Sequence, residues 1–185
     1  EIGSGLVGSE MCIRDRCSLL NARTKINDLY YNLDTSSRTA TVTYAMTGEY
    51  NYFFLPASVK IPETVTYNGV TFTVTKIADR AFSYCKYMEE ISIPGTVTEV
   101  GTTSTYYSSS YDNLPFYACT SLKKVRFEDG KQSIFLGAYY NSGSSIGLGL
   151  FASCPLEEVY IGRNITYDNN CLLYTSPSPR DRSLS

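Results

Sequence analysis

The sequence predicts a mainly β fold: a solenoid of short strands with short helical turns, preceded by a β-hairpin cap. Three observations support this prediction. The same residue pattern occurs three times along the chain. Apolar and polar residues alternate at the end of each copy, as they do in strands. The composition, with 17 Tyr, many Thr, Ser and Val and few Ala or Lys, favours strands over helices.

The repeated unit spans residues 81–93, 115–127 and 150–161. It begins with a Phe, has a Cys three positions later and then an apolar residue, and ends on two alternating apolar residues. Because one unit cannot bury its apolar face alone, successive units are expected to stack around a continuous core. The predicted core positions are Phe82, Cys85, Met88, Ile91, Ile93, Phe116, Cys119, Leu122, Val125, Phe127, Phe151, Cys154, Leu156, Val159 and Ile161.

Residues 17–75 are expected to form a β-rich N-terminal cap. Apolar and polar residues alternate within segments 29–33 and 39–44, and a polar turn lies between the two segments. This pattern predicts a hairpin. A second hairpin is expected around Asn68-Gly69, because Asn-Gly suits a type I′ turn. Such a cap would cover the open apolar end and the unpaired strand edge of the first turn. No matching cap follows Ile161, so the natural protein is expected to continue.

The two ends, residues 1–16 and 171–185, are expected to be foreign to the natural protein. LVGSEMCIRDR at 6–16 and CLLYTSPSPR at 171–180 can be encoded by one DNA segment read in opposite orientations. That arrangement resembles translated transposase adapters from sequencing libraries. Segments of this kind carry no information about the natural fold, so we expect residues 17–170 to be the part that belongs to the natural protein.

Composition and motifs argue against catalysis and against nucleic-acid binding. The formal net charge is −2, without the concentrated basic patch of a nucleic-acid binder. The chain has no His, so a Ser-His-Asp triad is impossible. Glu157 and Glu158 are neighbours, not acids that converge across a substrate, and the Gly-rich stretch 142–149 lacks the Lys of a P-loop. No apolar run is long enough to insert into a membrane. We therefore expect no enzyme activity, no catalytic, cofactor-binding or metal site, and no cofactor.

Two segments carry a resemblance to a known family. AFSYCKYMEEISIPGTVTEVG at 81–101 and FYACTSLKKVRFEDG at 116–130 resemble the BspA-type leucine-rich repeat, which is common in surface and secreted proteins of bacteria and some parasitic protists. Residues 28–82 resemble the β-rich lead-in that often precedes such repeats in gut bacteria. The resemblance implies a leucine-rich-repeat solenoid of at least three turns over residues 76–170, and an extracellular or cell-surface location.

The repeat spacing departs from that family. Its repeats recur at roughly 23 residues, whereas Phe82, Phe116 and Phe151 are 34 and 35 residues apart. The excess lies in two insertions near 102–114 and 138–149, which are rich in Ser, Gly and Tyr. We interpret both insertions as loops that bulge from one edge of the solenoid.

Three cysteines occupy one repeat position, so Cys85, Cys119 and Cys154 are expected to stack in a column inside the solenoid. One interpretation is a metal site. The other is a column of small buried residues beside each Phe, since free Cys is among the most buried residue types. The lack of His and the presence of at most three thiolates in line favour packing.

A candidate binding surface has two parts. On the solvent side of the repeats, aligned residues read Glu89–Lys123–Glu157, Glu90–Lys124–Glu158 and Ser92–Arg126–Tyr160, which is either a charge ladder that fixes register or a polar binding face. The Tyr-rich insertions suit either a recognition surface or a mobile spacer. The candidate surface residues are Tyr106, Tyr107, Tyr111, Tyr139, Tyr140, Arg126 and Tyr160.

The resemblance and these residues together predict a non-catalytic binding or adhesion module of a secreted or surface-anchored bacterial protein. Its expected partner is a protein or cell-surface ligand, or a glycan. Two alternatives stay open: a structural spacer, and an accessory glycan-binding module of a larger enzyme.

Overall fold

The computed structural model describes residues 23–44, 55–102, 104–106, 114–137, 139–141 and 147–167. The description of residues 104–106, 139–141, 147–148 and 167 is confined to the backbone. The ends that we expect to be foreign, 1–16 and 171–185, lie outside the described residues.

Within those residues the chain forms strands and turns but no helix, in agreement with the predicted mainly β fold. The places expected to hold short helical turns hold single turns with backbone bonds from one residue to the third before it, such as Cys85 N–H to Phe82 O at 3.1 Å. The strands are β1 Thr24–Ile26, β2 Leu29–Asp34, β3 Thr39–Thr43, β4 Ser58–Lys60, β5 Thr64–Tyr67, β6 Val70–Ile77, β7 Glu90–Ile93, β8 Glu99–Val100, β9 Ser104–Tyr106, β10 Lys124–Phe127, β11 Ile134–Leu136, β12 Tyr139–Asn141, β13 Gly147–Leu148, β14 Glu158–Ile161 and β15 Ile165–Tyr167.

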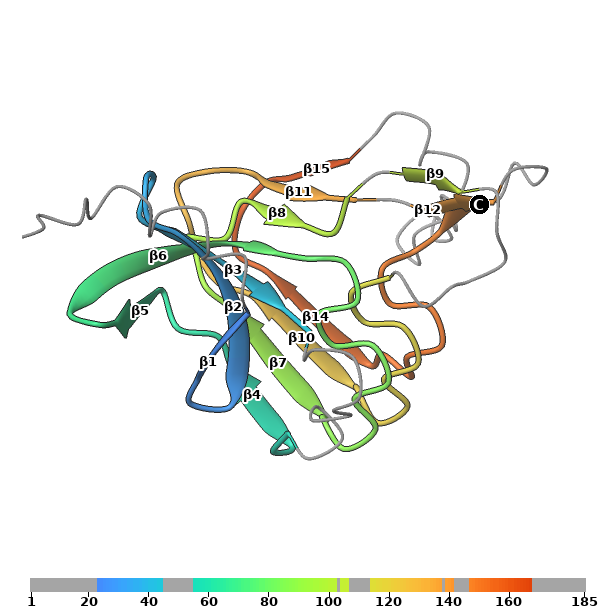
Figure 1. Ribbon diagram of the computed structural model, residues 1–185. Coiled ribbons are helices and arrows are strands. Elements are labelled where there is room, and N and C mark those ends of the chain that lie inside the picture. The colour runs from blue at the N-terminus through green and yellow to red at the C-terminus, as the bar shows by residue number, and fades with distance from the viewer. Residues whose placement is uncertain are drawn as a thin grey trace, which may run out of the picture.

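One face of the solenoid is a parallel sheet in the order β14-β10-β7-β4 (Figure 1). Its register places Val125 opposite both Ile91 and Val159, and Arg126 opposite both Ser92 and Tyr160. This is the alignment that the repeated pattern predicts. Parallel pairing without offset requires each turn to have the same shape, so the sequence repeat translates directly into a ladder.

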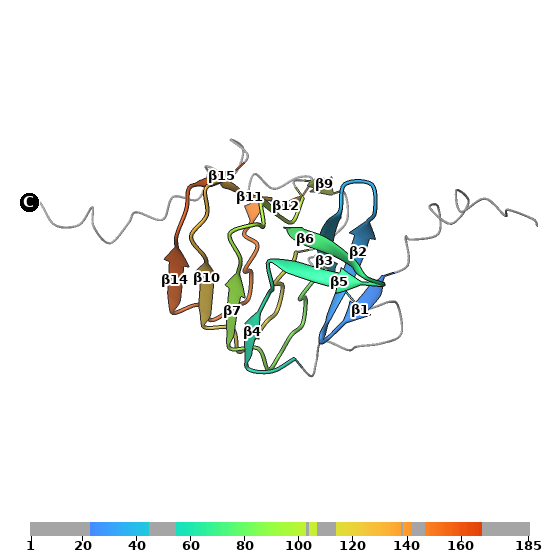
Figure 2. The same cartoon turned by 90° about the vertical axis from the view of Figure 1, so that its left-hand side faces the viewer.

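The second sheet joins the cap to the repeats. Its order is β1-β2-β3-β6-β8-β11-β15, with β5 paired to β6 at the side. Each repeat passes from the parallel sheet to this one, from β7 to β8, from β10 to β11 and from β14 to β15, and the two rows of strands are visible in Figure 2. The apolar side chains of both sheets fill the space enclosed by the turns.

Both predicted hairpins are confirmed. β2 pairs with β3 in antiparallel fashion, and β5 pairs with β6. At the second hairpin Asn68 and Gly69 have φ of 49° and 76°, as the two central residues of a type I′ turn require. β4 lies inside the range expected for the cap, yet it pairs in parallel with β7, so the ladder of the repeats begins before residue 75.

The insertions are not wholly loops, and that expectation is wrong for three short segments. β12 pairs in parallel with β9, and β13 pairs with β12, which gives a small third sheet. The physical reason is that successive turns place the two insertions at the same edge, where their backbones meet and can hydrogen-bond. No local sequence signal reports such a pairing.

The interior of the turns contains two columns. The Phe116 ring stacks between those of Phe82 and Phe151, with centroids 5.3 and 4.8 Å away and interplanar angles of 3° and 19°. Beside this Phe column, the Cys119 thiol donates to the carbonyl oxygen of Phe82 at 3.0 Å, and the Cys154 thiol donates to that of Phe116 at 3.0 Å. Each cysteine therefore links its own turn to the preceding one.

Candidate functional site

The outward face of the parallel sheet carries the polar residues that the sequence aligned. Inward and outward residues alternate along each strand, so the buried Ile91 and Val125 leave Ser92 and Arg126 on the outside. The register extends this outer row from Lys60 on β4 to Tyr160 on β14. The structure thus brings together the two predicted surface residues of the repeats, Arg126 and Tyr160.

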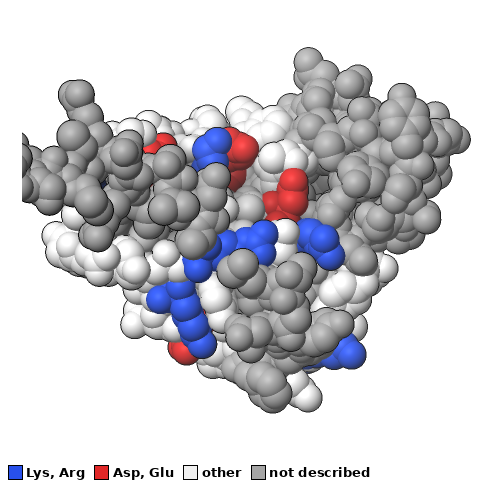
Figure 3. All heavy atoms as spheres, viewed as in Figure 1, with Lys and Arg blue, Asp and Glu red and all other residues white. Residues whose placement is uncertain are grey.

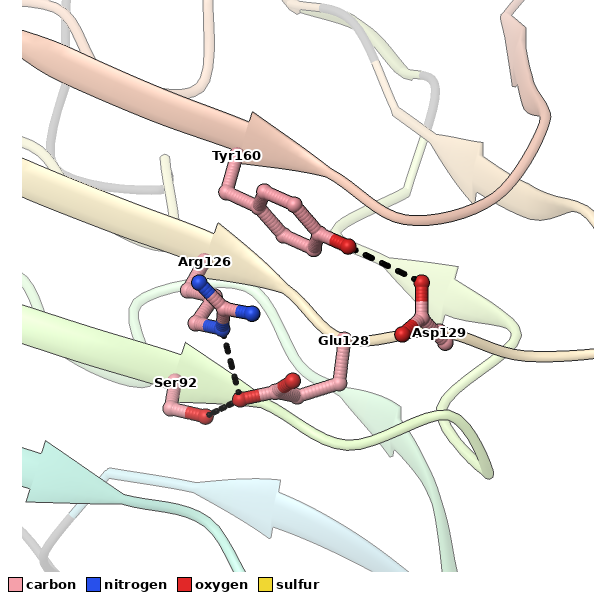
Figure 4. Close-up of polar contacts among 5 residues, drawn as sticks. All are labelled: Ser92, Arg126, Glu128, Asp129 and Tyr160. Carbon is pink, nitrogen blue, oxygen red and sulfur yellow. Dashed lines mark hydrogen bonds and ion pairs between the residues drawn. The ribbon is translucent and has the colours of Figure 1, made fainter.

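Five residues of this face form a connected group, which we call the outer-face cluster (Figure 4). Arg126 Nε donates to Glu128 Oε1 at 3.1 Å, and Ser92 Oγ donates to the same oxygen at 2.7 Å. The Arg126 guanidinium carbon lies 3.9 Å from the ring centroid of Tyr160. The Tyr160 hydroxyl in turn donates to Asp129 Oδ1 at 3.0 Å. The cluster ties β7, β10 and β14 together on the outside.

Electrostatics keep this cluster in ordinary ionisation states. The hydrogen bond from Ser92, followed by that from Arg126, lowers the pKa of Glu128. The hydrogen bond with Glu128 raises the pKa of Arg126, and the one to Asp129 raises the pKa of Tyr160. Glu128 is therefore a carboxylate, Arg126 a cation and Tyr160 a neutral donor near neutral pH. Such an arrangement binds by hydrogen bonds and stacking, because no group is tuned for proton transfer.

The predicted charge ladder is present on one side of β10. Lys123 Nζ lies 3.5 Å from Glu157, and Lys124 Nζ lies 3.4 Å from Glu158. Toward β7, the ion pairs found among the described residues include none with Glu90, although Glu90 is opposite Lys124. All four paired side chains are half-exposed or more, so each pair contributes about 0–1 kcal/mol. The ladder alone is a weak determinant of register.

The Tyr-rich insertions contribute backbone pairing to the candidate surface. Tyr106 ends β9, and Tyr139 and Tyr140 lie in β12, with Asn141 opposite Tyr106. The parallel pairing places β9 and β12, one strand from each insertion, side by side. Tyr107 and Tyr111 lie outside the described residues.

The predicted repeat core is buried in the first two units and only partly in the third. Every predicted core residue from Phe82 to Phe127 is at most 1% exposed. In the third unit Phe151, Cys154 and Leu156 are half-buried, whereas Val159 is 46% and Ile161 54% exposed. The reason is that, among the described strands, β14 is the outermost of its sheet and pairs with β10 alone.

The structure describes no candidate metal centre. Within the described part of the chain, no three His, Cys, Asp or Glu residues are grouped as ligands would be. The thiols of Cys119 and Cys154 bond to carbonyl oxygens of the adjacent turn. The neighbouring Cys119 thiol, and then burial, raise the pKa of Cys154 above its usual range, which disfavours the thiolate that a metal would need.

Sequence reasoning missed Glu128, Asp129 and Arg163. The acidic pair follows β10 at the position where the first unit has Pro94-Gly95, and this contrast within the repeat was a usable signal. Arg163 was unmarked because an Arg after a strand is normally exposed. Here it is 8% exposed and donates to the carbonyl oxygens of Gly95 and Pro94 at 2.8 and 2.9 Å.

The part of the chain that carries the repeats matches a known family. A sequence model described as "BspA type Leucine rich repeat region (6 copies)" matches residues 50–178, which is more than half of the chain. The chain belongs to the BspA-type leucine-rich-repeat family. Leucine-rich repeats commonly mediate protein interactions, so membership of this family indicates an interaction or surface-protein module.

Three solved structures are similar to this BspA-type chain. A leucine-rich cell surface protein from Faecalibacterium prausnitzii is 25% identical, with a TM-score of 0.48. The match covers 79% of this chain and 32% of the Faecalibacterium chain. Leucine-rich repeat proteins from Bacteroides ovatus and Bacteroides capillosus are both 20% identical, with TM-scores of 0.44 and 0.42. Each of these two matches covers 78% of this chain. They cover 37% of the Bacteroides ovatus chain and 98% of the Bacteroides capillosus chain.

This chain therefore spans about a third of the length of the first two of these structures. Among curated proteins, no match was found. Within the described residues, no helix is long and apolar enough to cross a membrane.

Proposed function

We propose that this BspA-type region is a non-catalytic binding module of a secreted or surface-anchored bacterial protein, and that it binds a protein ligand through the outer face of its parallel sheet. The observation that carries the proposal is the outer-face cluster of Ser92, Arg126, Glu128, Asp129 and Tyr160. Family membership supports the non-catalytic role and the surface location.

Arg126 is prepared for an incoming acceptor. Its Nε donates to Glu128 and its guanidinium carbon lies 3.9 Å from the centroid of the Tyr160 ring, so two contacts hold the guanidinium in place. The hydrogen bond that Arg126 makes with a described residue uses Nε, so the terminal amino groups remain as donors. A fixed Arg loses less conformational entropy on binding than a mobile one.

Arg126 and Tyr160 are also of the residue types that dominate binding energies at protein interfaces. The surrounding Lys and Glu side chains are half-exposed or more and suit the polar rim of such an interface. A carboxylate or carbonyl group of a protein ligand that meets the Arg126 amino groups, with an apolar group against the Tyr160 ring, would use both features.

The test is a binding screen with the whole chain. Purified chain is applied to cells and to immobilised extracellular proteins, and Arg126→Ala is compared with the wild type. Lys131→Ala is the matched control, because Lys131 is an exposed cation two residues after Asp129 and is no part of the cluster. We expect Arg126→Ala to weaken binding about tenfold or more and Lys131→Ala to leave it unchanged.

Circular dichroism of both variants establishes that the fold is intact. Binding that survives both Arg126→Ala and Tyr160→Ala would refute the proposed face. Absence of any binding partner for the wild type would instead favour the structural spacer, for which the outer-face cluster serves only to hold the turns in register.

A further inference from the structure

A second group of cations lies on the cap, away from the outer-face cluster. The guanidinium carbon of Arg23 lies 3.7 Å from the ring centroid of Tyr44, and that of Arg80 lies 5.5 Å from the same centroid. Lys25 Nζ lies 5.7 Å from the ring centroid of Tyr30. We call Arg23, Lys25, Arg80 and Tyr44 the cap cluster.

The fold assembles these cations from distant parts of the chain. β1 places Lys25 on the hairpin sheet, Tyr44 follows β3, and Arg80 follows β6, which pairs with β3. Figure 3 shows Lys and Arg side chains gathered across the middle of this face, with most of the Asp and Glu side chains in view above them. The net charge of the chain is −2, so this local excess of positive charge is a property of the folded surface.

The guanidinium groups of Arg23 and Arg80 lie at the same ring, which brings two positive charges together. A cation at an exposed aromatic face gains about 0.5–1 kcal/mol. Four ion pairs connect described residues, and neither Arg80 nor Lys25 takes part in any of them. A negative group placed beside Arg80 and Lys25 would gain charge-assisted contacts, which makes the cap cluster suited to an anion.

Arg80 is one of seven described non-glycine residues with a positive φ. Its φ is 63°, in the left-handed region that is unfavourable for a bulky residue. The same repeat position is Leu114 in the second unit and Gly149 in the third, and neither has a positive φ. The repeat therefore requires neither the arginine nor this conformation. Strained residues of this kind are concentrated at functional positions.

We propose that the cap cluster binds the sulfate or carboxylate groups of an anionic polysaccharide, with Arg80 as the main contact and Lys25 and Arg23 beside it. A folded protein partner would need an apolar anchor, and the described residues of the cap cluster offer none. Tyr30 is only 8% exposed, and a face of the Tyr44 ring is occupied by Arg23. What the cap cluster offers is charge and guanidinium hydrogen bonds, which fit a hydrophilic anionic chain.

The test uses the whole chain and immobilised heparin, a polymer with both sulfate and carboxylate groups. We expect the wild type to bind at low ionic strength and to weaken as salt is added, since exposed charges are screened. Arg80→Gly should lower the affinity about tenfold, as the loss of one charge-assisted contact implies. Glycine tolerates the left-handed conformation, so this variant removes the charge without adding strain.

Lys131→Ala is the matched control, because it removes one exposed positive charge elsewhere and should leave heparin binding unchanged. Arg126→Ala should also bind heparin normally, which separates this site from the proposed protein-binding face. Three results would overturn the proposal: no heparin binding by the wild type, equal losses in Arg80→Gly and Lys131→Ala, or tighter binding of poly-glutamate than of heparin. The last result would identify an acidic peptide as the ligand.

Discussion

The middle repeat and the last described repeat carry the same kinds of residue at the same positions, but they are buried to different degrees. Val125 and Phe127 are both 1% exposed, whereas their counterparts Val159 and Ile161 are 46% and 54% exposed. The residues are similarly apolar, so the difference comes from the neighbours. β10 has a strand on each side, and β14 has one on one side only. In a solenoid, burial is a property of the stack as much as of the residue.

This comparison predicts that the same substitution has unequal effects in the two repeats. Phe116→Ala removes a fully buried ring that stacks on two others, and we expect a loss of roughly 3–5 kcal/mol in the free energy of unfolding. Phe151→Ala removes a half-buried ring and should cost roughly half as much. Urea unfolding followed by circular dichroism measures both. Equal losses would show that position in the stack does not govern these energies.

Hydrogen bonds from the Arg163 side chain hold the exposed last repeat to the first unit. The Arg163 side chain crosses the middle turn next to Gly130, where an added Cβ would lie 3.1 Å from Arg163 Cδ, and ends on carbonyl oxygens of the first unit. Burial lowers the pKa of Arg163, but an Arg stays charged at neutral pH. Its two hydrogen bonds therefore join three successive turns.

Arg163→Met keeps most of the apolar stem and removes both hydrogen bonds. We expect a loss of about 2–3 kcal/mol, because both bonds lost come from a charged donor. The carbonyl oxygen of Gly95 loses the Arg163 bond, whereas that of Pro94 still accepts from the Val97 N–H at 3.1 Å. Lys131→Ala, an exposed cation on the adjacent loop, should change the free energy of unfolding by less than about 0.5 kcal/mol. Hydrogen exchange would locate the effect at β14 and β15. A loss no larger than that of the control would contradict the attachment role.

The sequence-based prediction was accurate for the features that repeat from one turn to the next. The Phe-x-x-Cys units gave the solenoid, the parallel register and the interior columns, because a repeated pattern can only stack in step. The pairing of β9 with β12 was not predictable, since it arises when two polar insertions meet in space. The outer-face cluster was predicted in part. Ser92, Arg126 and Tyr160 aligned in the repeat, but Glu128 and Asp129 lie outside the repeated strand.

The Cys column provides a smaller contrast between the same two repeats. The Cys119 thiol is fully buried, and the carbonyl oxygen that it meets, that of Phe82, also accepts from the Cys85 N–H at 3.1 Å. Because that oxygen stays bonded without the thiol, Cys119→Ala should cost only about 1–2 kcal/mol. Cys154→Ala, in the half-buried last repeat, should cost less. The free energies of unfolding in urea give the order, and the reverse order would contradict the model of unequal burial.

The smallest predicted effect concerns Glu128, a residue of the middle turn whose repeat counterparts are Pro94 and Gly162. Its pKa is lowered from 4.5, mainly by the hydrogen bond from Ser92. A carboxylate whose pKa is lower in the folded state contributes stability at pH values above its unfolded-state pKa. That contribution disappears as the pH falls through its folded-state pKa. NMR titration of the Glu128 carboxyl carbon should therefore show a midpoint below 4.5, and Ser92→Ala should raise it. Thr96→Ala, which changes a hydroxyl outside the outer-face cluster, is the control. If Ser92→Ala leaves the Glu128 midpoint unchanged, the hydrogen bond between Ser92 on β7 and Glu128 in the middle turn does not stabilise the Glu128 carboxylate.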